Sequence, residues 1–312
     1  MKFINDYLEG EEFAEQALIV SVTKNTNKNG KPYLDMQLKD ISGTRNAKKW
    51  DILPNDENIF VSGNILFVEG KVVAFNNSLQ LNINRGDLLS ESEIDINRFV
   101  FKAPVPYEEL LKQFNNYRSQ VKNEDLNKIL NYIFDRHLDK FLTYPAASSI
   151  HHDYRHGLLY HTVSMLNHAE HFINYYGDLD QELLYAGIIL HDLGKVIELE
   201  GKYSFKYSLE GKLIGHISII SSLVGEARNN LHITSEKGLL LQHMVLSHHG
   251  QLEYGSPVLP LTKEALLLSM IDNIDSKMNI VIKATEEVEK GGYTSKLFPL
   301  DGRIMYVPKD DE

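Results

Sequence analysis

The stretch that decides the fold is residues 183–195, which read LLYAGIILHDLGK. The run from Leu183 to Leu190 is apolar apart from one tyrosine, as expected for a buried helix. His191 and Asp192 follow at once, at the point where this helix would end inside the protein. Burying two ionisable side chains there is costly unless something pairs with them or binds them. The stretch therefore predicts a helical core that carries a binding site.

The composition narrows the class of protein. A chain of 312 residues with 43% hydrophobic residues suggests about two folded domains. It has no cysteine, which excludes disulfides, thiolate metal sites and cysteine nucleophiles and is typical of a reducing, cytoplasmic location. No apolar run approaches the roughly 18 residues of a membrane span, so we expect no membrane partner. With a net charge of −11, binding of a polyanion requires a local basic patch or metal ions.

The histidines divide the chain into two parts, because all 13 lie between His137 and His249. Residues 12–88 instead read as short strands, for example KPYLDMQLKD at 31–40, where polar and apolar residues alternate. Strands joined by short turns predict a small barrel or sandwich. Residues 91–106 contain Pro104 and Pro106 and resemble a linker.

After Tyr107 the hydrophobic period becomes helical, and it stays so through residues 263–290. Gly194 and Gly250 stand just after helical runs, where a C-terminal cap favours glycine. Nearly every predicted helix carries an ionisable residue on or near its apolar face. A set with one or two such residues per helix is typical of a metal site inside a helical bundle. The candidate ligands are His161, His191, Asp192, His216, His248, His249 and Asp272.

A single buried histidine is usually an ordinary core residue, so the prediction depends on the whole set. Imidazoles combined with carboxylates suit Mn, Fe, Co, Ni or Zn. Asp192 is the candidate bridge, because a carboxylate can join two ions and an imidazole cannot. Two ions can clamp a phosphoryl group and generate a hydroxide near neutral pH. Asp192 and Lys195 are therefore the candidate catalytic residues, with Lys195 holding a phosphate oxygen or assisting the leaving group. Asp275 is expected to contact a ligand or lie on the surface.

The ordered series of motifs resembles the HD-domain metal-dependent phosphohydrolases, and within them the YhaM-type 3′→5′ exoribonucleases. The stretches that carry the resemblance include LLYAGIILHDLGKVIEL, YSLEGKLIGHISI, LQHMVLSHHGQLEYGSP and IDNIDSKMN. The resemblance implies two divalent ions per chain, with Mn²⁺ favoured and Co²⁺, Fe²⁺ or Ni²⁺ as alternatives. It implies a first ion bound by His161, His191, Asp192 and Asp272, and a second bound by Asp192, His216 and His248. His249 is a weaker candidate.

The resemblance also implies an OB-fold in residues 1–90, a linker at 91–106 and an all-α HD-domain bundle in residues 107–312. Between Lys24 and Lys49 there are seven basic and two acidic residues, a local excess that suits a nucleic-acid surface. The interleaved aromatics Tyr33, Trp50, Phe60 and Phe67 are candidates for stacking bases, although single aromatics are as often core residues. The predicted nucleic-acid-binding residues are Lys24, Lys28, Lys31, Tyr33, Arg45, Lys48 and Lys49.

We therefore expect a multidomain enzyme that hydrolyses single-stranded RNA, and also single-stranded DNA, from the 3′ end. The direction of attack follows only from the resemblance. Two other functions stay open at this point. One is a phosphohydrolase acting on a small nucleotide, and the other is a non-catalytic adaptor that binds single-stranded RNA. Helix faces within residues 107–141 are candidates for subunit contacts in a homo-oligomer, but they fix no stoichiometry.

Overall fold

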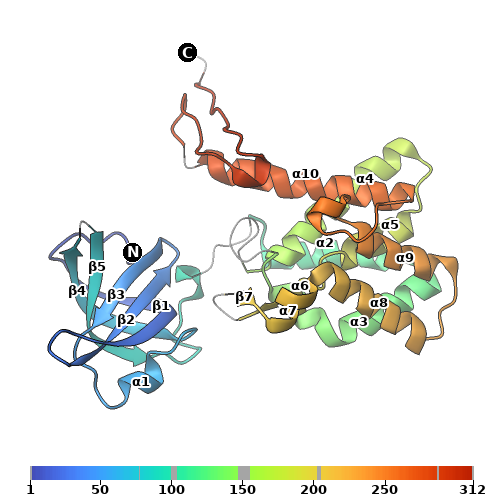
Figure 1. Cartoon of the computed structure of the whole chain (residues 1–312). Coiled ribbons are helices and arrows are strands. Elements are labelled where there is room, and N and C mark those ends of the chain that lie inside the picture. Colours follow the sequence, from blue (N-terminus) through green and yellow to red (C-terminus); the bar gives the residue numbers. More distant parts are fainter. Residues whose placement is uncertain are drawn as a thin grey trace. The chain divides into compact units, whose positions relative to one another are not determined.

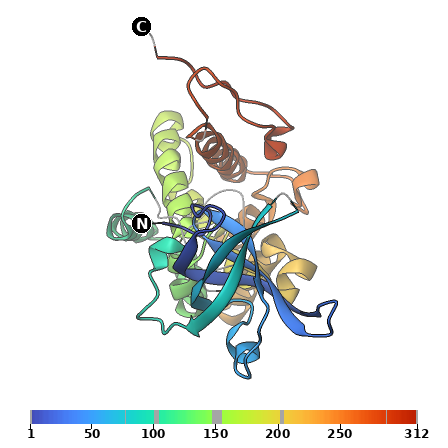
Figure 2. The ribbon, with the colours of Figure 1, turned by 90° about the vertical axis from the view of Figure 1, so that its left-hand side faces the viewer.

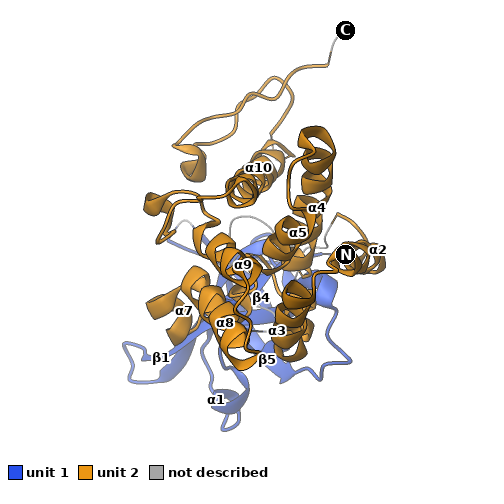
Figure 3. Ribbon diagram, turned by 90° about the vertical axis from the view of Figure 1, so that its right-hand side faces the viewer, with its two compact units in different colours: residues 1–102, 201–206 blue, residues 103–200, 207–312 orange. Residues whose placement is uncertain are grey.

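The computed structural model describes residues 2–76, 78–99, 104–146, 155–201, 205–286 and 288–310. The chain divides into two compact units, residues 1–102 with 201–206 and residues 103–200 with 207–312 (Figure 3). The predicted linker 91–106 lies partly outside the described residues, and the predicted domain limits stay a prediction. No helix in the described ranges is long and apolar enough to cross a lipid bilayer.

The first unit is a closed barrel of five strands in the order β1-β2-β3-β5-β4 (Figures 1 and 2). Only β3 and β5 run parallel; the other pairs, including β1 with β4, are antiparallel. This OB-like barrel confirms the predicted all-β first domain. Of the two folds that the strands predict, a small barrel and a sandwich, the structure has the barrel. The strands are β1 (Glu12–Thr26), β2 (Pro32–Asp40), β3 (Gly43–Lys49), β4 (Ile65–Phe75) and β5 (Ser78–Leu88), with a short helix α1 (Asp56–Ile59) between β3 and β4.

Alternation of side chains sets the inside of the barrel. In β2, Leu34, Met36 and Leu38 are buried in its core, as their spacing predicts. β1 is long enough to pair with β4 through its first half and with β2 through its second half. A register shift between Ile19 and Ser21 marks the change of partner, and such bulges bend a strand so that a sheet can close.

The residues after β5 belong to the barrel unit rather than to a free linker. Phe99, which follows the short helix η1 (Ile96–Arg98), packs with Leu18 and Ile65 in a small core. The Arg98 guanidinium is buried and forms an ion pair with Glu15. The first part of the predicted linker is therefore ordered against the barrel.

The second unit is all-helical in its core, as predicted, and is built around α5 (Gln181–Leu190). Every residue from Leu183 to Leu190 is buried, which explains why this stretch is apolar on all sides. The other elements are α2 (Tyr107–Gln120), α3 (Glu124–Thr143), α4 (Gly157–Tyr176), α6 (Lys195–Glu198), β6 (Leu199–Glu200), β7 (Lys206–Tyr207), α7 (Leu209–Ile214), α8 (His216–Asn230), α9 (Glu236–Ser247), η2 (Leu252–Tyr254), α10 (Lys263–Glu286) and η3 (Phe298–Leu300).

Gly194 has a role that differs from the predicted left-handed cap. Its φ of −55° is that of an ordinary right-handed helix. A β-carbon at this position would lie 2.3 Å from the His216 carbonyl oxygen, so only glycine allows the two backbones to approach. This contact holds the turn after α5 against the first residue of α8. Gly250 does adopt a positive φ, of 76°, after α9.

The chain after α10 folds back on itself as an irregular hairpin. Isolated bridges join Tyr293 to Tyr306 and Leu297 to Arg303. Leu297 and Leu300 are buried against Ile280 of α10 in a separate small core. The short helix η3 is therefore fixed to the last third of α10.

Candidate metal centre

Five helices of the second unit bring the predicted ligands together. His161 lies in the second turn of α4, and His191 and Asp192 directly follow α5. His216 is the first residue of α8, His248 and His249 follow α9, and Asp272 lies in α10. For all of them except His161 and Asp272, placement at a helix end lets the polar side chain reach the interior without interrupting an apolar helix face. The side chains of His191 and His248 are fully buried, and that of Asp192 is 4% exposed.

The Asp192 carboxylate lies between two groups of imidazole nitrogens. Its Oδ2 atom is 3.7 Å from His161 Nε2 and 3.4 Å from His191 Nε2. Its Oδ1 atom is 3.4 Å from His216 Nε2 and 3.7 Å from His248 Nε2. Each oxygen therefore faces a different histidine pair, which is the arrangement that a bridging carboxylate requires.

Asp272 and His249 complete the two groups. Asp272 Oδ1 is 3.2 Å from His161 Nε2, on the side of the first pair. A donor atom of His249 lies within 4.8 Å of those of His216 and His248. The same limit holds for His161, His191 and Asp192. The predicted ligands thus separate into two sets that meet at Asp192.

All five histidines use one ring nitrogen to hold the ring in place. His191 Nδ1 lies 2.7 Å from the Ile188 carbonyl, His248 Nδ1 2.7 Å from that of Val245, and His249 Nδ1 2.7 Å from that of Tyr254. A carbonyl accepts only, so these Nδ1 atoms carry the proton and Nε2 keeps its lone pair.

Two buried carboxylates orient the remaining histidines. His161 Nδ1 lies 2.6 Å from Asp275 Oδ2, and His216 Nδ1 lies 3.0 Å from Glu198 Oε1. Asp275 also accepts a hydrogen bond from the Ser164 hydroxyl. Such outer contacts fix the tautomer and the direction of a metal-binding imidazole. Asp275 was expected either to contact a ligand or to lie on the surface, and in the structure it contacts the candidate ligand His161. Glu198 was missed, because it lies 18 residues from His216 in an ordinary-looking stretch, VIELE.

Three atoms at the centre are buried and have no hydrogen-bond partner within the described residues. They are Asp192 Oδ1, His216 Nε2 and His248 Nε2. Buried polar atoms without partners are rare and costly, and here all three converge on one point. A neutral imidazole nitrogen and a carboxylate oxygen are both electron-pair donors, so a cation satisfies all of them together. The residues present therefore fit a divalent metal ion.

Neighbouring charges and burial shift the pKa values of several side chains at the centre. Burial raises the pKa of Asp192, but the charges of Lys195 and His191 outweigh it and hold the pKa well below its usual range. Burial lowers the pKa of His161, but hydrogen bonds to Asp272 and Asp275 raise it to about 10. Burial dominates at His248 and lowers its pKa to about 4. His248 is therefore neutral at pH 7 and ready to donate an electron pair, whereas a metal ion at His161 must displace a proton.

Lys195 forms an ion pair with Asp192, a contact that was not predicted from the sequence. Its Nζ atom lies 2.7 Å from Asp192 Oδ2, and its side chain is 13% exposed. Burial lowers the pKa of Lys195, but the attraction of Asp192 reverses this and raises it. The ammonium is therefore charged beside the central carboxylate. Lys195 also lines the cavity beside the centre. Its predicted contact with a phosphate oxygen stays a prediction.

A cavity of about 480 Å³ opens onto the centre. Ligand sites in proteins range from about 300 to 1,000 Å³, so the cavity has room for a nucleotide-sized molecule. His161, Asp192, Lys195, His249 and Asp272 form one part of its lining. The remainder comes from Ala146, the η2 turn, α10 and the hairpin after it, and none of these residues was among the predicted site residues.

The barrel carries the predicted basic patch only in part. Lys24, Lys28 and Lys31 are exposed, and Tyr33 and Lys48 are half-buried. Two predicted nucleic-acid-binding residues are wrong. Arg45 is buried and donates hydrogen bonds to the carbonyls of Ile4 and Tyr7. Lys49 is buried too, with Nζ 2.9 Å from the Asn84 carbonyl and 3.4 Å from Asp56 Oδ2.

The physical reason for this error is the period of a strand. In β3 the side chains of Arg45, Ala47 and Lys49 alternate with exposed or half-buried ones, so they point into the barrel. A count of charges along the sequence does not distinguish the two faces. Phe60 is likewise buried in the barrel core and is excluded from stacking. Trp50 is 40% exposed, and its ring centroid lies 4.7 Å from that of Tyr33.

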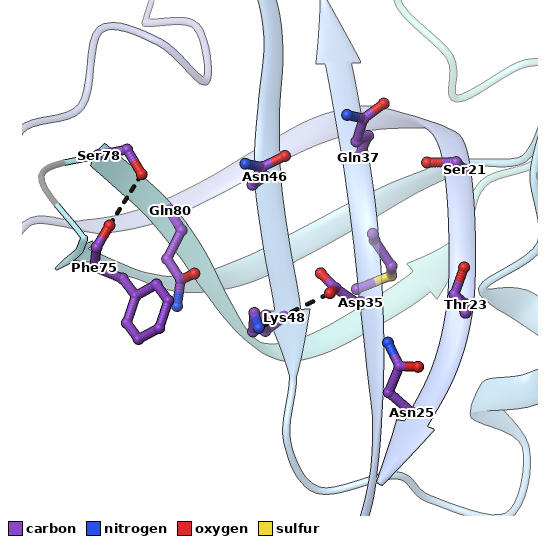
Figure 4. A pocket seen from close by; sticks show the side chains of 11 residues that line it. Ser21, Thr23, Asn25, Asp35, Gln37, Asn46, Lys48, Phe75, Ser78 and Gln80 are labelled. Carbon is purple, nitrogen blue, oxygen red and sulfur yellow. Dashed lines mark hydrogen bonds and ion pairs between the residues drawn. The ribbon is translucent and has the colours of Figure 1, made fainter. Parts of the chain in front are cut away.

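A groove of about 480 Å³ lies on the outer face of the barrel strands (Figure 4). Lys48 projects into it and lies over three rings, with Nζ 5.0 Å from the Tyr33 centroid, 5.4 Å from Trp50 and 5.7 Å from Phe75. The polar lining residues were missed, because short hydroxyl and amide side chains on a strand look like any solvated face. They are Ser21, Thr23, Asn25, Gln37, Asn46, Ser78 and Gln80. The lining also contains the Asp35 carboxylate, whose Oδ2 atom is 3.8 Å from Lys48 Nζ.

Comparison with solved structures returned an OB-fold domain, a single-stranded DNA binding protein and a protein bound to a DNA junction. The second OB-fold domain of replication protein A from Methanococcus maripaludis is 19% identical over 29% of this chain and 95% of its own, with a TM-score of 0.24. The mitochondrial single-stranded DNA binding protein Rim1 from S. cerevisiae is 17% identical over 26% of this chain and 97% of its own, with a TM-score of 0.22. RecG bound to a three-way DNA junction is 18% identical over 56% of this chain and 28% of its own, with a TM-score of 0.23.

The family model of the HD domain matches residues 158–277. This range starts in α4, three residues before His161, and ends in α10, five residues after Asp272. It therefore contains all the residues that the structure brings together at the centre. The segment from residue 158 to residue 277 is an HD domain, which indicates a metal-dependent phosphohydrolase.

Proposed function

We propose that this chain is a 3′→5′ exoribonuclease, which hydrolyses the phosphodiester bonds of single-stranded RNA at a centre of two divalent ions. The observation that carries the proposal is the Asp192 carboxylate, whose two oxygens face separate groups of histidine nitrogens. Two ions held in this way clamp a phosphoryl group and supply a hydroxide nucleophile near neutral pH. Mn²⁺ is the ion we favour.

The residues of the chain divide the work at the centre. His161, His191 and Asp272 would hold one ion, His216 and His248 the other, and Asp192 both. Asp275 and Glu198 hold the rings of His161 and His216, so the donor nitrogens need no rearrangement when an ion arrives. The Lys195 ammonium limits the negative charge around Asp192, and it lines the cavity where a phosphate oxygen would lie.

The barrel supports RNA rather than a small nucleotide as the substrate. Its groove combines the Lys48 ammonium and the Phe75 ring with many amide and hydroxyl groups, and the rings of Tyr33 and Trp50 lie next to Lys48. Ring stacking and backbone charge bind single strands with little sequence preference. The cavity at the metal centre has room for a mononucleotide, which needs no such groove.

Two labelled RNAs test the proposal. With Mn²⁺ present, an RNA labelled at its 5′ end should give a ladder of progressively shorter labelled products. The same RNA labelled at its 3′ end should release labelled mononucleotide from the first time point. The Asp192→Asn variant should give neither product, and Asp139→Asn, an exposed carboxylate on α3, should act like the natural protein.

Other outcomes would identify the alternatives. Release of phosphate from nucleoside triphosphates, without shortening of RNA, would show a small-nucleotide phosphohydrolase. Binding of RNA without any hydrolysis at Mn²⁺, Co²⁺ or Fe²⁺ would show an adaptor. If the 3′-labelled RNA yields a ladder, the enzyme degrades RNA from the 5′ end, and the proposed direction is wrong.

A further inference from the structure

The cavity beside the metal centre has one wall that does not belong to the centre. α10 contributes Asn273, Ser276 and Lys277, and the hairpin after it contributes Phe298, Pro299 and Asp301. The first group is polar and includes an exposed ammonium. The second group presents an aromatic ring. A cavity lined both by candidate metal ligands and by an aromatic ring can hold the two ends of a nucleotide, its phosphate and its base.

Phe298 is held at this cavity by its neighbours. Leu297 and Leu300 are buried against Ile280, whereas Phe298 between them is 83% exposed. The Leu297 amide donates to the Arg303 carbonyl at 2.9 Å, and that of Thr294 to the Met305 carbonyl at 2.9 Å. These bonds fix the backbone on both sides of η3. The ring is therefore presented to solvent by a rigid turn, although leaving a large apolar side chain exposed gains nothing for the fold.

We propose that Phe298 forms the nucleobase subsite of the metal centre, where its ring stacks on the base of the nucleotide whose phosphodiester is being hydrolysed. This inference rests on the proposed function and extends it. Stacking accepts every base, because each has a π-face, so the subsite selects for the presence of a base and not for its identity. Lys277, on the α10 wall, faces the same cavity and suits the phosphate end of the nucleotide.

Binding of two product-like ligands to the 312-residue chain tests the subsite without relying on turnover. Adenosine 5′-monophosphate and ribose 5-phosphate share the same phosphate and sugar and differ only in the base. The natural protein should bind the first about tenfold more tightly, as expected for one stacked base. Phe298→Ala should abolish this difference, and Phe298→Trp should restore it. Titration calorimetry gives all the affinities.

A comparison of two RNA substrates on two forms of the protein gives the second test. RNA with a terminal base and RNA with a terminal abasic ribose are compared on the natural protein and on Phe298→Ala. Loss of the ring should lower kcat/KM about tenfold on the first RNA, mainly through KM, and much less on the second. Ile304→Ala removes another exposed apolar side chain of the same hairpin, outside the cavity, and should match the natural protein. Thermal unfolding of each variant confirms that the hairpin is intact.

The two proposals fail in different ways. Equal losses on both RNAs, or equal affinities for the two ligands in the natural protein, would overturn the subsite and leave the exoribonuclease unaffected. Failure of the natural protein to shorten any RNA would overturn the proposed function. In that case a base-dependent affinity that Phe298→Ala removes would still support the subsite, now for a small nucleotide.

Discussion

Asp192 concentrates the function of the centre in one side chain. Both groups of histidines lie beside its carboxylate, His161 and His191 at Oδ2 and His216 and His248 at Oδ1. Its charge also balances that of Lys195. Under the proposed function, a substitution here should therefore affect both ions together.

We expect Asp192→Asn to abolish hydrolysis and most of the bound metal while leaving the fold intact. The amide keeps the shape of the carboxylate but offers one weak donor oxygen in place of two charged ones. Activity should fall by more than about 100-fold, beyond the loss usual for an outer contact. Elemental analysis and turnover measure the two effects. Retention of most of the natural metal content would show that Asp192 joins no two ions.

Glu198 offers a finer test at the same scale, because it acts through His216. Glu198→Ala should weaken the affinity for metal by about 10- to 100-fold, since the His216 ring loses its orientation. Glu198→Gln should retain most of the affinity, because the amide oxygen still accepts from His216 Nδ1. Metal titration of the two variants distinguishes orientation from charge. Equal losses would mean that the charge of Glu198 matters more than its hydrogen bond.

At the scale of the strand, β3 carries two neighbouring lysines with different roles: Lys49 stabilises the barrel, and Lys48 is a candidate for binding RNA. Lys49 points inward to Asp56, and the side chains of both are almost fully buried, at 3% and 7% exposure. Lys49→Met leaves Asp56 as a buried charge without this partner, which costs about 3 kcal/mol of barrel stability. Chemical denaturation measures it, and Lys71→Met, at an exposed position of β4, is the matched control. A loss below about 1 kcal/mol would contradict the pairing.

Lys48, the next residue along β3, should behave in the opposite way. Lys48→Glu places a negative charge among the rings of the groove and should weaken binding of single-stranded RNA about tenfold or more, with little effect on stability. Fluorescence anisotropy with a labelled RNA measures the affinity. Lys71→Glu has the same change of charge outside the groove and should have a small effect. Equal effects would mean that net charge, not the groove, controls binding.

These contrasts show what the sequence reveals at the level of elements. The alternation of β2 and the apolar length of α5 predict buried faces because core packing depends on them directly. The ligand set is predictable for a related reason, since ionisable residues at the ends of apolar helices need a partner. The buried contacts of Arg45, Lys49 and Glu198 could not be predicted, because their partners are distant in the sequence and only the folded chain brings them near. Phe298 could not be predicted either, because a sequence does not reveal which aromatic stays exposed.

At the scale of the whole molecule, the two units have separate cores and separate tasks under the proposed function. Hydrolysis of a long RNA should fall steeply with salt, because backbone contacts release bound counterions. Hydrolysis of a small activated phosphodiester, which needs the HD domain alone, should depend much less on salt. Paired salt titrations of the full chain on the two substrates measure the slopes. Equal slopes would show that the barrel adds nothing to substrate binding.

The ligands of the centre extend from His161 in α4 to Asp272 in α10. An ion shared between them closes a long segment of chain, much as a disulfide bond does, and it binds the folded state only. At 100 times its dissociation constant, such an ion adds about 2.7 kcal/mol of stability. Removal of metal by a chelator should therefore lower the unfolding temperature of the helical unit by roughly 5–10 °C, as calorimetry would show, and Asp192→Asn should lose this response. In a cell, metal starvation would then shorten the lifetime of the protein by exposing it to proteases, and its abundance as well as its activity would follow the metal supply.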